Sequence, residues 1–402
     1  MTIRRAANAC ALLTLLVAST TASEADAGLL DGMEAVSFAA ANPKVGIALT
    51  PGHTGQALRF TFADGCASAF ATGRVRGTPA WNAAAGLSFW VQGDGSEHCG
   101  ALQLVWNDDF AQRYDVAFPI NTTGWTRVVV PWRDLVPVLS NAASVPLDAH
   151  GARPPGQLGA LWFGKWWYWR DCAAHSYAID DLRLETTIPL DTADHRPDGA
   201  PLARTLAKLA AGQPITVVAM GDSLTDTHHW SNREHSWLDT FSATLQSTWH
   251  VAPKIINTAI GGTELRQNLV LMPCWLQATP HPDLVVVEFG GNDWNSGMRG
   301  PAFLAAQRDA IQRIRRATGG SADVLVVATL PSAATWDAIG ELATACREAA
   351  ASERAGLADG FAAFHALGKD HPELFASDQT HLGAAGQACL GKTVAEAIAA
   401  MK

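Results

Sequence analysis

A serine, a glycine pair, an asparagine and an Asp/His pair stand in the C-terminal half of the sequence, either just after apolar runs or just before the last helical segment. They are Ser223, Gly261-Gly262, Asn292, Asp378 and His381. A serine hydroxyl attacks a carbonyl carbon when a nearby base takes its proton, and histidine can do so near neutral pH. A carboxylate can orient that histidine, and N–H donors can stabilise the oxyanion. These residue types indicate acyl transfer through a serine nucleophile, with no cofactor needed for the chemistry.

An alternation of buried strands and helices is expected to position these residues. Strand-like apolar runs cover residues 215–220, 254–257, 284–288 and 324–329, and helical segments cover 233–248, 301–318, 336–354 and 383–401. Continuous apolar strands that alternate with helices indicate a parallel sheet covered on both faces. Ligands of such sheets bind outside the carboxyl ends of the strands. The serine, glycine and asparagine blocks each follow a strand, so we expect them at one rim.

Four blocks in this half resemble the GDSL esterase/lipase family, also called SGNH hydrolases. They are Gly221-Asp222-Ser223-Leu224, residues 257–262, Gly290-Gly291-Asn292-Asp293 and Asp378-x-x-His381. The resemblance covers residues 213–402 and implies a three-layer α/β/α, flavodoxin-like parallel sheet.

The resemblance also implies a role for each residue. Ser223 would be the nucleophile, His381 the base and Asp378 the group that orients the base. The oxyanion hole would consist of the backbone N–H groups of Ser223 and Gly262 and the side-chain amide of Asn292. Glycine suits position 262 because the backbone must approach the substrate closely there.

Two acids and three tryptophans near these blocks have less defined roles. Asp222 either fixes its loop or takes part in the chemistry, and Asp293 is expected to be structural. Trp230, Trp294 and Trp336 follow or lie near strand ends, and we expect them to line the same rim as the serine.

Residues 28–187 are predicted to form an all-β domain. Runs typical of strands cover residues 57–62, 87–92, 101–106, 114–118, 126–132, 158–162 and 177–184, with Gly, Pro, Asn and Asp clusters between them. Several short strands separated by turn signals indicate a sandwich or jelly roll. The segment 188–212 is predicted to be a linker and lead-in helix to the second domain, residues 213–402.

Three motifs of this all-β region resemble the jelly-roll modules of carbohydrate-binding proteins and of the complex I intermediate-associated, galactose-binding-like family. They are Leu30-Asp31-Gly32-Met33-Glu34, Leu87-Ser88-Phe89-Trp90-Val91 and Ala178-Ile179-Asp180-Asp181-Leu182. The resemblance implies sugar binding on a sheet face and a structural calcium ion. Asp31, Glu34 and Asp181 are the candidate oxygen ligands. The alternative is that these acids are ordinary solvent-facing residues.

Tryptophan is concentrated in the all-β region. Of the 15 Trp in the chain, nine lie between residues 81 and 169. If the run 162–169 were one continuous strand, its aromatic side chains would alternate between two faces, and both faces cannot belong to one core. Flat aromatic faces suit sugar rings and protein packing alike. Sugar binding and packing between domains are therefore equal alternatives, with a plain core as the third.

Residues 1–27 have the features of a signal peptide: Arg4-Arg5, the apolar stretch 9–18 and Ala25-Asp26-Ala27. We therefore expect export to the periplasm or the exterior, which are oxidising. The remaining cysteines are Cys66, Cys99, Cys172, Cys274, Cys346 and Cys389, three in each half. Their pairing stays open, although a disulfide at every cysteine would require a bridge between the halves.

Composition narrows the function further. The net charge of −9 and the 17% charged residues exclude a basic nucleic-acid-binding protein. Outside the N-terminal segment no apolar run approaches about 18 residues, so no transmembrane helix is expected.

The sequence predicts an exported serine esterase that acts on an acylated carbohydrate, most simply an O-acetyl ester, or on a small ester. The alternatives are a lipase, lysophospholipase or arylesterase, and a non-catalytic carbohydrate-binding protein. The oligomeric state stays open.

Overall fold

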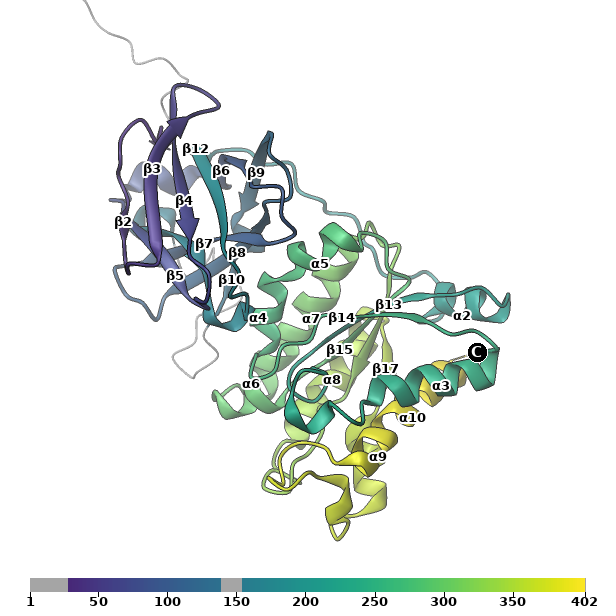
Figure 1. The fold of residues 1–402 in the computed structure, drawn as a ribbon. Helices are drawn as coiled ribbons and strands as arrows, with labels where there is room; N and C mark the ends of the chain where they lie inside the picture. The colour runs from purple at the N-terminus through teal and green to yellow at the C-terminus, as the bar shows by residue number, and fades with distance from the viewer. Residues whose placement is uncertain (1–27, 139–153, 402) are drawn as a thin grey trace, which may run out of the picture.

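The computed structural model describes residues 28–138 and 154–401, which form two halves side by side (Figure 1). The expected signal peptide, residues 1–27, lies outside the described residues. Among the described residues, no helix has both the length and the apolar character required to cross a membrane.

The N-terminal half consists of two antiparallel sheets packed face to face. The first sheet contains β1 (Leu29–Asp31), β3 (Val45–Pro51), β4 (Gln56–Phe62), β6 (Gly86–Gln92), β9 (Trp125–Pro131) and β12 (His175–Glu185). The second contains β2 (Ala39–Ala40), β5 (Ala69–Arg74), β7 (Cys99–Trp106), β8 (Arg113–Pro119), β10 (Val136–Pro137) and β11 (Leu158–Lys165). Alternate side chains of both sheets, including Phe60, Phe89 and Phe163, meet in one buried cluster. The expected β sandwich is confirmed.

The C-terminal half is built around a parallel sheet with the strand order β14-β13-β15-β16-β17. The strands are β13 (Thr216–Gly221), β14 (Lys254–Asn257), β15 (Leu284–Glu288), β16 (Asp323–Val327) and β17 (Gly356–Ala358). The helices are α2 (Ala203–Ala210), α3 (Trp237–Trp249), α4 (Leu265–Val270), α5 (Met272–Ala278), α6 (Gly291–Asn295), α7 (Gly300–Ala317), α8 (Gly340–Glu353), α9 (Gly360–Leu367) and α10 (Ala384–Ala400).

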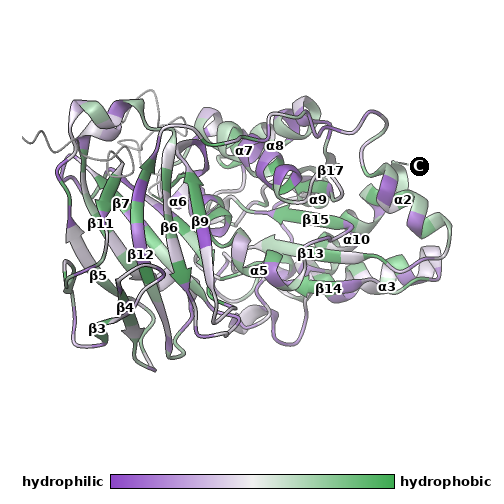
Figure 2. Cartoon of the chain, turned by 90° about the horizontal axis from the view of Figure 1, so that it is seen from above, coloured by the Kyte–Doolittle hydropathy of each residue, from purple (hydrophilic) through white to green (hydrophobic). Residues whose placement is uncertain are grey.

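Alternate residues of the parallel strands face two separate hydrophobic clusters. In β13, Val217 and Ala219 belong to the cluster that contains side chains of α3 and α10, whereas Val218 and Met220 belong to the cluster with α4, α7 and α8. Figure 2 shows the hydrophobic strands β13 and β15 between α7 and α8 on one side and α3 on the other. The expected three-layer α/β/α fold is therefore confirmed, with its central strands β13, β15 and β16 buried on both faces.

The tryptophan-rich run 162–169 is not one continuous strand. Strand β11 ends at Lys165, and residues Trp167–Trp169 form a single 3-10 turn. Trp166 and Trp169 are buried in the same cluster as Leu269 and Trp275 of the C-terminal half, while Trp167 is 55% exposed. Part of the aromatic excess thus packs the two halves together.

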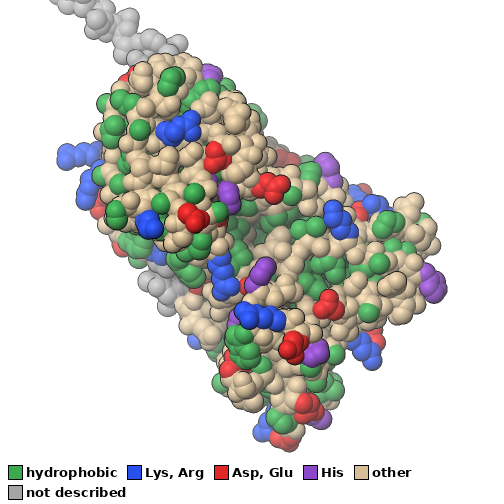
Figure 3. Space-filling model, in the orientation of Figure 1, with side chains coloured by type: hydrophobic (Ala, Val, Ile, Leu, Met, Phe, Trp, Pro, Cys, Tyr) green, Lys and Arg blue, Asp and Glu red, His purple; other side chains and the backbone are tan. Residues whose placement is uncertain are grey.

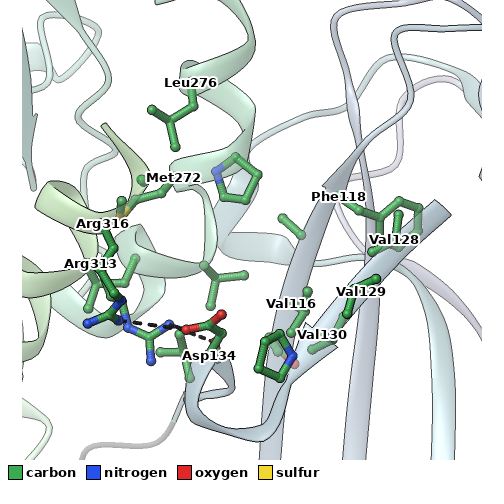
Figure 4. Close-up of a pocket in the computed structure, with 18 of the residues that line it drawn as sticks. Val116, Phe118, Val128, Val129, Val130, Asp134, Met272, Leu276, Arg313 and Arg316 are labelled. Carbon is green, nitrogen blue, oxygen red and sulfur yellow. Dashed lines mark hydrogen bonds and ion pairs between the residues drawn. The ribbon is translucent and has the colours of Figure 1, made fainter. Parts of the chain in front are cut away.

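A second contact between the halves surrounds an apolar cleft. The cleft has a volume of about 420 Å³ and lies between β8 and β9 of the sandwich and helices α5 and α7 (Figures 3 and 4). At its edge the Arg313 guanidinium donates to the backbone oxygens of Arg133, at 2.9 Å, and Asp134, at 2.8 Å. None of the expected catalytic residues lines this cleft.

Candidate active site

Ser223, His381 and Asp378 form one hydrogen-bonded chain. Ser223 lies two residues beyond the end of β13, and its Oγ is 2.8 Å from His381 Nε2. His381 Nδ1 is 2.6 Å from Asp378 Oδ2. Because Asp378 accepts the Nδ1 proton, the neutral imidazole leaves its Nε2 lone pair for the serine proton. The structure thus brings together the three residues that the sequence predicts to carry the reaction.

A tight turn before α10 holds the Asp/His pair. The backbone N–H groups of Thr380 and His381 both donate to Asp378 Oδ1, at 3.0 Å each. Burial would raise the pKa of Asp378, but its hydrogen bonds from the His381 side chain and from these two N–H groups lower it to about 2. Asp378 is therefore ionised throughout the neutral range and can stabilise a positively charged His381.

The two expected backbone donors of the oxyanion hole are available. Within the described residues, neither the N–H of Ser223 nor that of Gly262 donates to another protein group. Gly262 has a φ of +81°, in the left-handed region that favours glycine. A Cβ at Gly261 would lie 3.2 Å from the Cβ of Ser223, so the glycine loop runs close to the nucleophile.

The amide of Asn292 is oriented by its neighbours. Its Nδ2 donates to Asp222 Oδ2, at 3.1 Å, and to the backbone oxygen of Thr263, at 3.0 Å. Asp222 in turn accepts from the N–H of Leu224, at 2.9 Å. Burial raises the pKa of Asp222 to about 6, against the opposing effects of this N–H, His381 and Asn292. Of the two roles that the sequence left open for Asp222, these contacts favour the fixing of the loop.

Two further acids, Asp293 and Glu288, lie beneath the site and connect the motifs that contain the site residues. Asp293 is fully buried, and its Oδ1 accepts from the N–H of Leu265 at 3.2 Å, which agrees with the structural role expected for it. Burial raises the pKa of Asp293 well above its usual range, and the nearby carboxylate of Glu264 adds to this effect. Glu288, at the end of β15, accepts from the Thr225 hydroxyl at 2.9 Å.

Two polar residues that were not predicted from the sequence fix the turn after the nucleophile. Asn232 Nδ2 donates to the backbone oxygens of Ser223, at 2.6 Å, and Asp226, at 2.9 Å. Asp226 Oδ2 accepts from the N–H of Gly261 at 2.9 Å, which connects the serine turn to the glycine loop. Asp226 Oδ1 also accepts from the N–H of His228, two residues further on, at 2.8 Å, and an aspartate that can fix a turn so soon after the serine was the available signal.

A cavity of about 240 Å³ opens beside the serine. Its lining combines the catalytic residues with the apolar side chains of Leu330, Pro331 and Ile339. Of the three tryptophans expected here, only Trp230 is near: it is 50% exposed and its ring lies 6.0 Å from that of His381.

Trp294 and Trp336, like Trp230, are not among the residues that line this cavity, contrary to expectation. Trp294 is partly buried against the core and covered by the guanidinium of Arg299, 3.9 Å from its ring centre. Trp336 stacks on His365, with ring centres 4.8 Å apart, and contacts Phe375. Position near a strand end does not fix where a large side chain points, and these two rings pack on Arg299 and on His365 instead.

The three acids expected to bind calcium are not gathered into one site. Asp31 accepts from Met33 N and Ser37 Oγ, Glu34 accepts from Gln56 N, and Asp181 pairs with Arg183. A β-bulge between residues 180 and 183 gives Asp181 a φ of +53° and leaves Asp180 as the buried acid of the pair. Among the described residues, the one group of three potential ligands whose atoms lie within 4.8 Å of one another is His98, Asp171 and His175.

Part of the C-terminal half is similar to a known protein family. Residues 219–389 match the GDSL-like lipase/acylhydrolase family. All five expected catalytic and oxyanion residues lie inside this GDSL-like region. The match supports a carboxylic ester hydrolase and leaves the substrate open.

Several solved structures resemble parts of the chain. An acetylxylan esterase, Axe2, from Geobacillus stearothermophilus is 18% identical over 46% of this chain and 94% of its own, with a TM-score of 0.39. A lipase/acylhydrolase from Enterococcus faecalis is 18% identical over 46% and 95%, with a TM-score of 0.38. A family 11 carbohydrate-binding module from Clostridium thermocellum is 12% identical over 40% and 97%, with a TM-score of 0.32. No curated protein matches the chain.

Proposed function

We propose that the protein is a secreted serine esterase that removes an acyl group, most simply acetyl, from a carbohydrate. The observation that carries the esterase chemistry is the hydrogen-bonded chain from Ser223 Oγ through His381 to Asp378. Secretion rests on the signal-peptide features of residues 1–27.

The reaction proceeds in two steps. His381 Nε2 takes the proton of Ser223 as the oxygen bonds to the ester carbonyl carbon, and Asp378 stabilises the imidazolium. The oxyanion lies against the N–H groups of Ser223 and Gly262 and the amide of Asn292, which exchanges one of its two bonds, to Asp222 or to Thr263, for a bond to the oxyanion. The C–O bond to the alcohol breaks, and the alcohol leaves with the proton from His381. A water molecule, deprotonated by the same histidine, then releases the acid and restores the serine.

Two features support a small acyl group on a carbohydrate. The cavity beside Ser223 has a volume of only about 240 Å³, and Leu330, Pro331 and Ile339 are apolar residues of its lining, which suits an acetyl group better than a long chain. Trp230 presents a half-exposed indole next to His381, and an indole face suits the apolar face of a sugar ring.

A substrate panel tests this proposal. Short-chain and long-chain nitrophenyl esters are compared with acetylated xylan, xyloglucan and peptidoglycan, and Ser223→Ala serves as the control. We expect hydrolysis of acetyl esters and of at least one acetylated glycan, and a loss of several orders of magnitude in Ser223→Ala. A preference for long acyl chains would instead indicate a lipase, and activity on aryl esters alone would indicate an arylesterase.

A further inference from the structure

The tryptophan-rich run of the sandwich ends at an arginine that reaches the other half of the molecule. Arg170 directly follows the 3-10 turn Trp167–Trp169 and has a φ of +51°. Trp166 and Trp169 are buried in the core shared by both halves. Asp171, the next residue, holds His98 Nδ1 at 2.7 Å. The sandwich therefore holds the backbone on both sides of Arg170.

The guanidinium of Arg170 binds the two groups that define the glycine loop. Its Nη1 lies 3.1 Å from Asp226 Oδ2, and its Nη2 donates to the backbone oxygen of Gly261 at 2.5 Å. The same Asp226 oxygen accepts from the N–H of Gly261 at 2.9 Å. Arg170 and Asp226 thus hold Gly261 by both its backbone polar groups.

These contacts fix the direction of the next N–H. The oxygen of Gly261 and the N–H of Gly262 belong to one trans peptide unit, so they point in opposite directions. Residues 260–263 form a turn closed by the bond from Thr263 N to the oxygen of Ile260, at 3.3 Å. The φ of +81° at Gly262 is that of a type II turn, and a flip of this one peptide converts type II into type I.

A flip would turn the Gly262 N–H away from the nucleophile side. Two consecutive glycines oppose such a flip only weakly, because glycine populates positive and negative φ about equally. The guanidinium opposes it directly, since the flip would remove the Gly261 oxygen from its donor. A charged donor on that oxygen also polarises the peptide and makes its N–H a better donor.

We propose that Arg170 is a positioning residue that holds the Gly261–Gly262 peptide in the orientation needed for the oxyanion hole. Through Arg170, the sandwich would then increase the turnover of any ester, whether or not it also binds sugar. This inference rests on the proposed function, because the role of the Gly262 N–H belongs to it.

Variants of Arg170 test the proposal on a small soluble ester such as nitrophenyl acetate. Loss of one oxyanion donor costs about 10²–10³-fold in kcat, and a peptide that flips part of the time costs less. We therefore expect Arg170→Ala to lower kcat about 10- to 10²-fold with little change in KM. Arg170→Gln and Arg170→Lys each retain one donor nitrogen and should restore part of the lost kcat. Added guanidinium ion at low concentration should rescue Arg170→Ala and leave the wild type unchanged.

Arg299→Ala is the matched control, because the side chain of Arg299 is 50% exposed and that of Arg170 is 51% exposed. Its kcat should stay within about twofold of the wild type. An unchanged kcat in folded Arg170→Ala would overturn the proposal, and so would a loss confined to KM. Retention of activity in Ser223→Ala would instead overturn the proposed function, so the two failures are distinguishable.

A second inference rests on a pair of thiols at the same interface. Cys99 is the first residue of β7 in the sandwich, and Cys274 lies on α5 in the other half. Both residues are free thiols in the structure, and the neighbouring Cys99 thiol, together with burial, raises the pKa of Cys274 well above its usual range. Gln277, one turn further along α5, also reaches Cys99, with Nε2 3.3 Å from Sγ. Both cysteines line one cavity between the halves.

We propose that Cys99 and Cys274 form a disulfide bridge between the two halves when the protein is exported. The two thiols lose two protons and two electrons as the S–S bond forms. A disulfide-carrying oxidoreductase of the oxidising compartment accepts them and is reduced to its dithiol. The bridge would connect the sandwich to α5 and would keep Arg170 at the glycine loop.

Peptide mapping without reduction tests the bridge on protein exported to an oxidising compartment. We expect one peptide pair joined through Cys99 and Cys274, which separates on reduction. Cys346 is the matched control: it is fully buried beside Thr329, with 3.7 Å between Sγ and Oγ1, and should be alkylated as a free thiol after unfolding. Reduction should lower the Tm of the wild type but not of Cys99→Ser. Alkylation of both Cys99 and Cys274 in unfolded, unreduced protein would overturn the proposal.

Discussion

The two halves of the molecule use their strands in different ways. In the parallel sheet, the central strands β13, β15 and β16 are buried on both faces, and polar groups gather where strands end, as Ser223 does after β13. In the sandwich, the strands form a core between two sheets, and the residue nearest the reaction, Arg170, lies in a turn after β11. In a parallel sheet, the position of a residue at the end of a strand therefore predicts that it belongs to the active site. In an antiparallel sandwich, position along the strands does not predict which residue contacts the active site.

The largest expected effect on kcat is a difference between two neighbouring histidines of the C-terminal half, His381 and His229. The rings of His229 and His381 are 4.1 Å apart, but His229 Nδ1 contacts Ser231 and not the nucleophile. His381→Ala should lower kcat about 10³-fold or more because the serine proton loses its acceptor. His229→Ala should cost less than about tenfold. Equal losses in the two variants, measured on one small ester, would show that contact with Ser223 does not define the base.

The next effect concerns the rim of the parallel sheet. Asn292→Ala should lower kcat about 10²–10³-fold, because it removes one donor from the oxyanion. Asp222→Asn should lower kcat less, since Asn292 would keep its bond to Thr263 and lose only the carboxylate that orients it. An effect of Asn292→Ala on KM alone would contradict the oxyanion role.

Some helices and strands of both halves could be predicted from the sequence, and others could not. The strands 87–92 and 177–184 and the helices 301–318 and 383–401 were expected within about two residues of their observed ends, because long hydrophobic patterns determine them. Helices α4 and α5 were missed, since they are short and α5 has a proline as its second residue. Ser223, Gly262 and Asn292 were found because they follow strands, and Asp378 and His381 because they precede the last helix.

The rest of the site depends on tertiary contacts that no local pattern encodes. Arg170 meets Gly261 across 91 positions of sequence, and the directions of Trp294 and Trp336 depend on packing. The spacing of Asp31, Glu34 and Asp181 likewise contains no sign of the bulge that displaces Asp181.

The smallest expected effect concerns the stability of the sandwich, through a buried acid that contacts the tryptophan-rich run. Asp115 is buried and accepts from Gln103 and from the Tyr168 hydroxyl, at 2.5 Å each. Burial raises its pKa to about 6, above the ordinary value of 3.8, against the opposing effect of these hydrogen bonds. The folded state therefore binds this proton more tightly than the unfolded state. The contribution of Asp115 to the free energy of unfolding should fall by about 3 kcal/mol as the pH rises from below 4 to above 6.

Asp115→Asn should remove this dependence, because an amide does not ionise. Urea unfolding of both proteins at pH 4, 5 and 7 measures the difference. We expect the wild type to lose more stability than the variant over this interval. A parallel decline in the two proteins would show that other buried acids, such as Glu288 and Asp293 in the parallel-sheet half, account for the pH dependence.

The most direct test of the central claim is covalent labelling with a fluorophosphonate, which reacts with activated serine hydroxyls and stays bound. The claim is that Ser223 is the nucleophile, activated by His381. We expect a single adduct on the peptide that contains Ser223, no adduct in Ser223→Ala and strongly slowed labelling in His381→Ala. Labelling of another residue, or no labelling in a protein that still hydrolyses esters, would contradict the account.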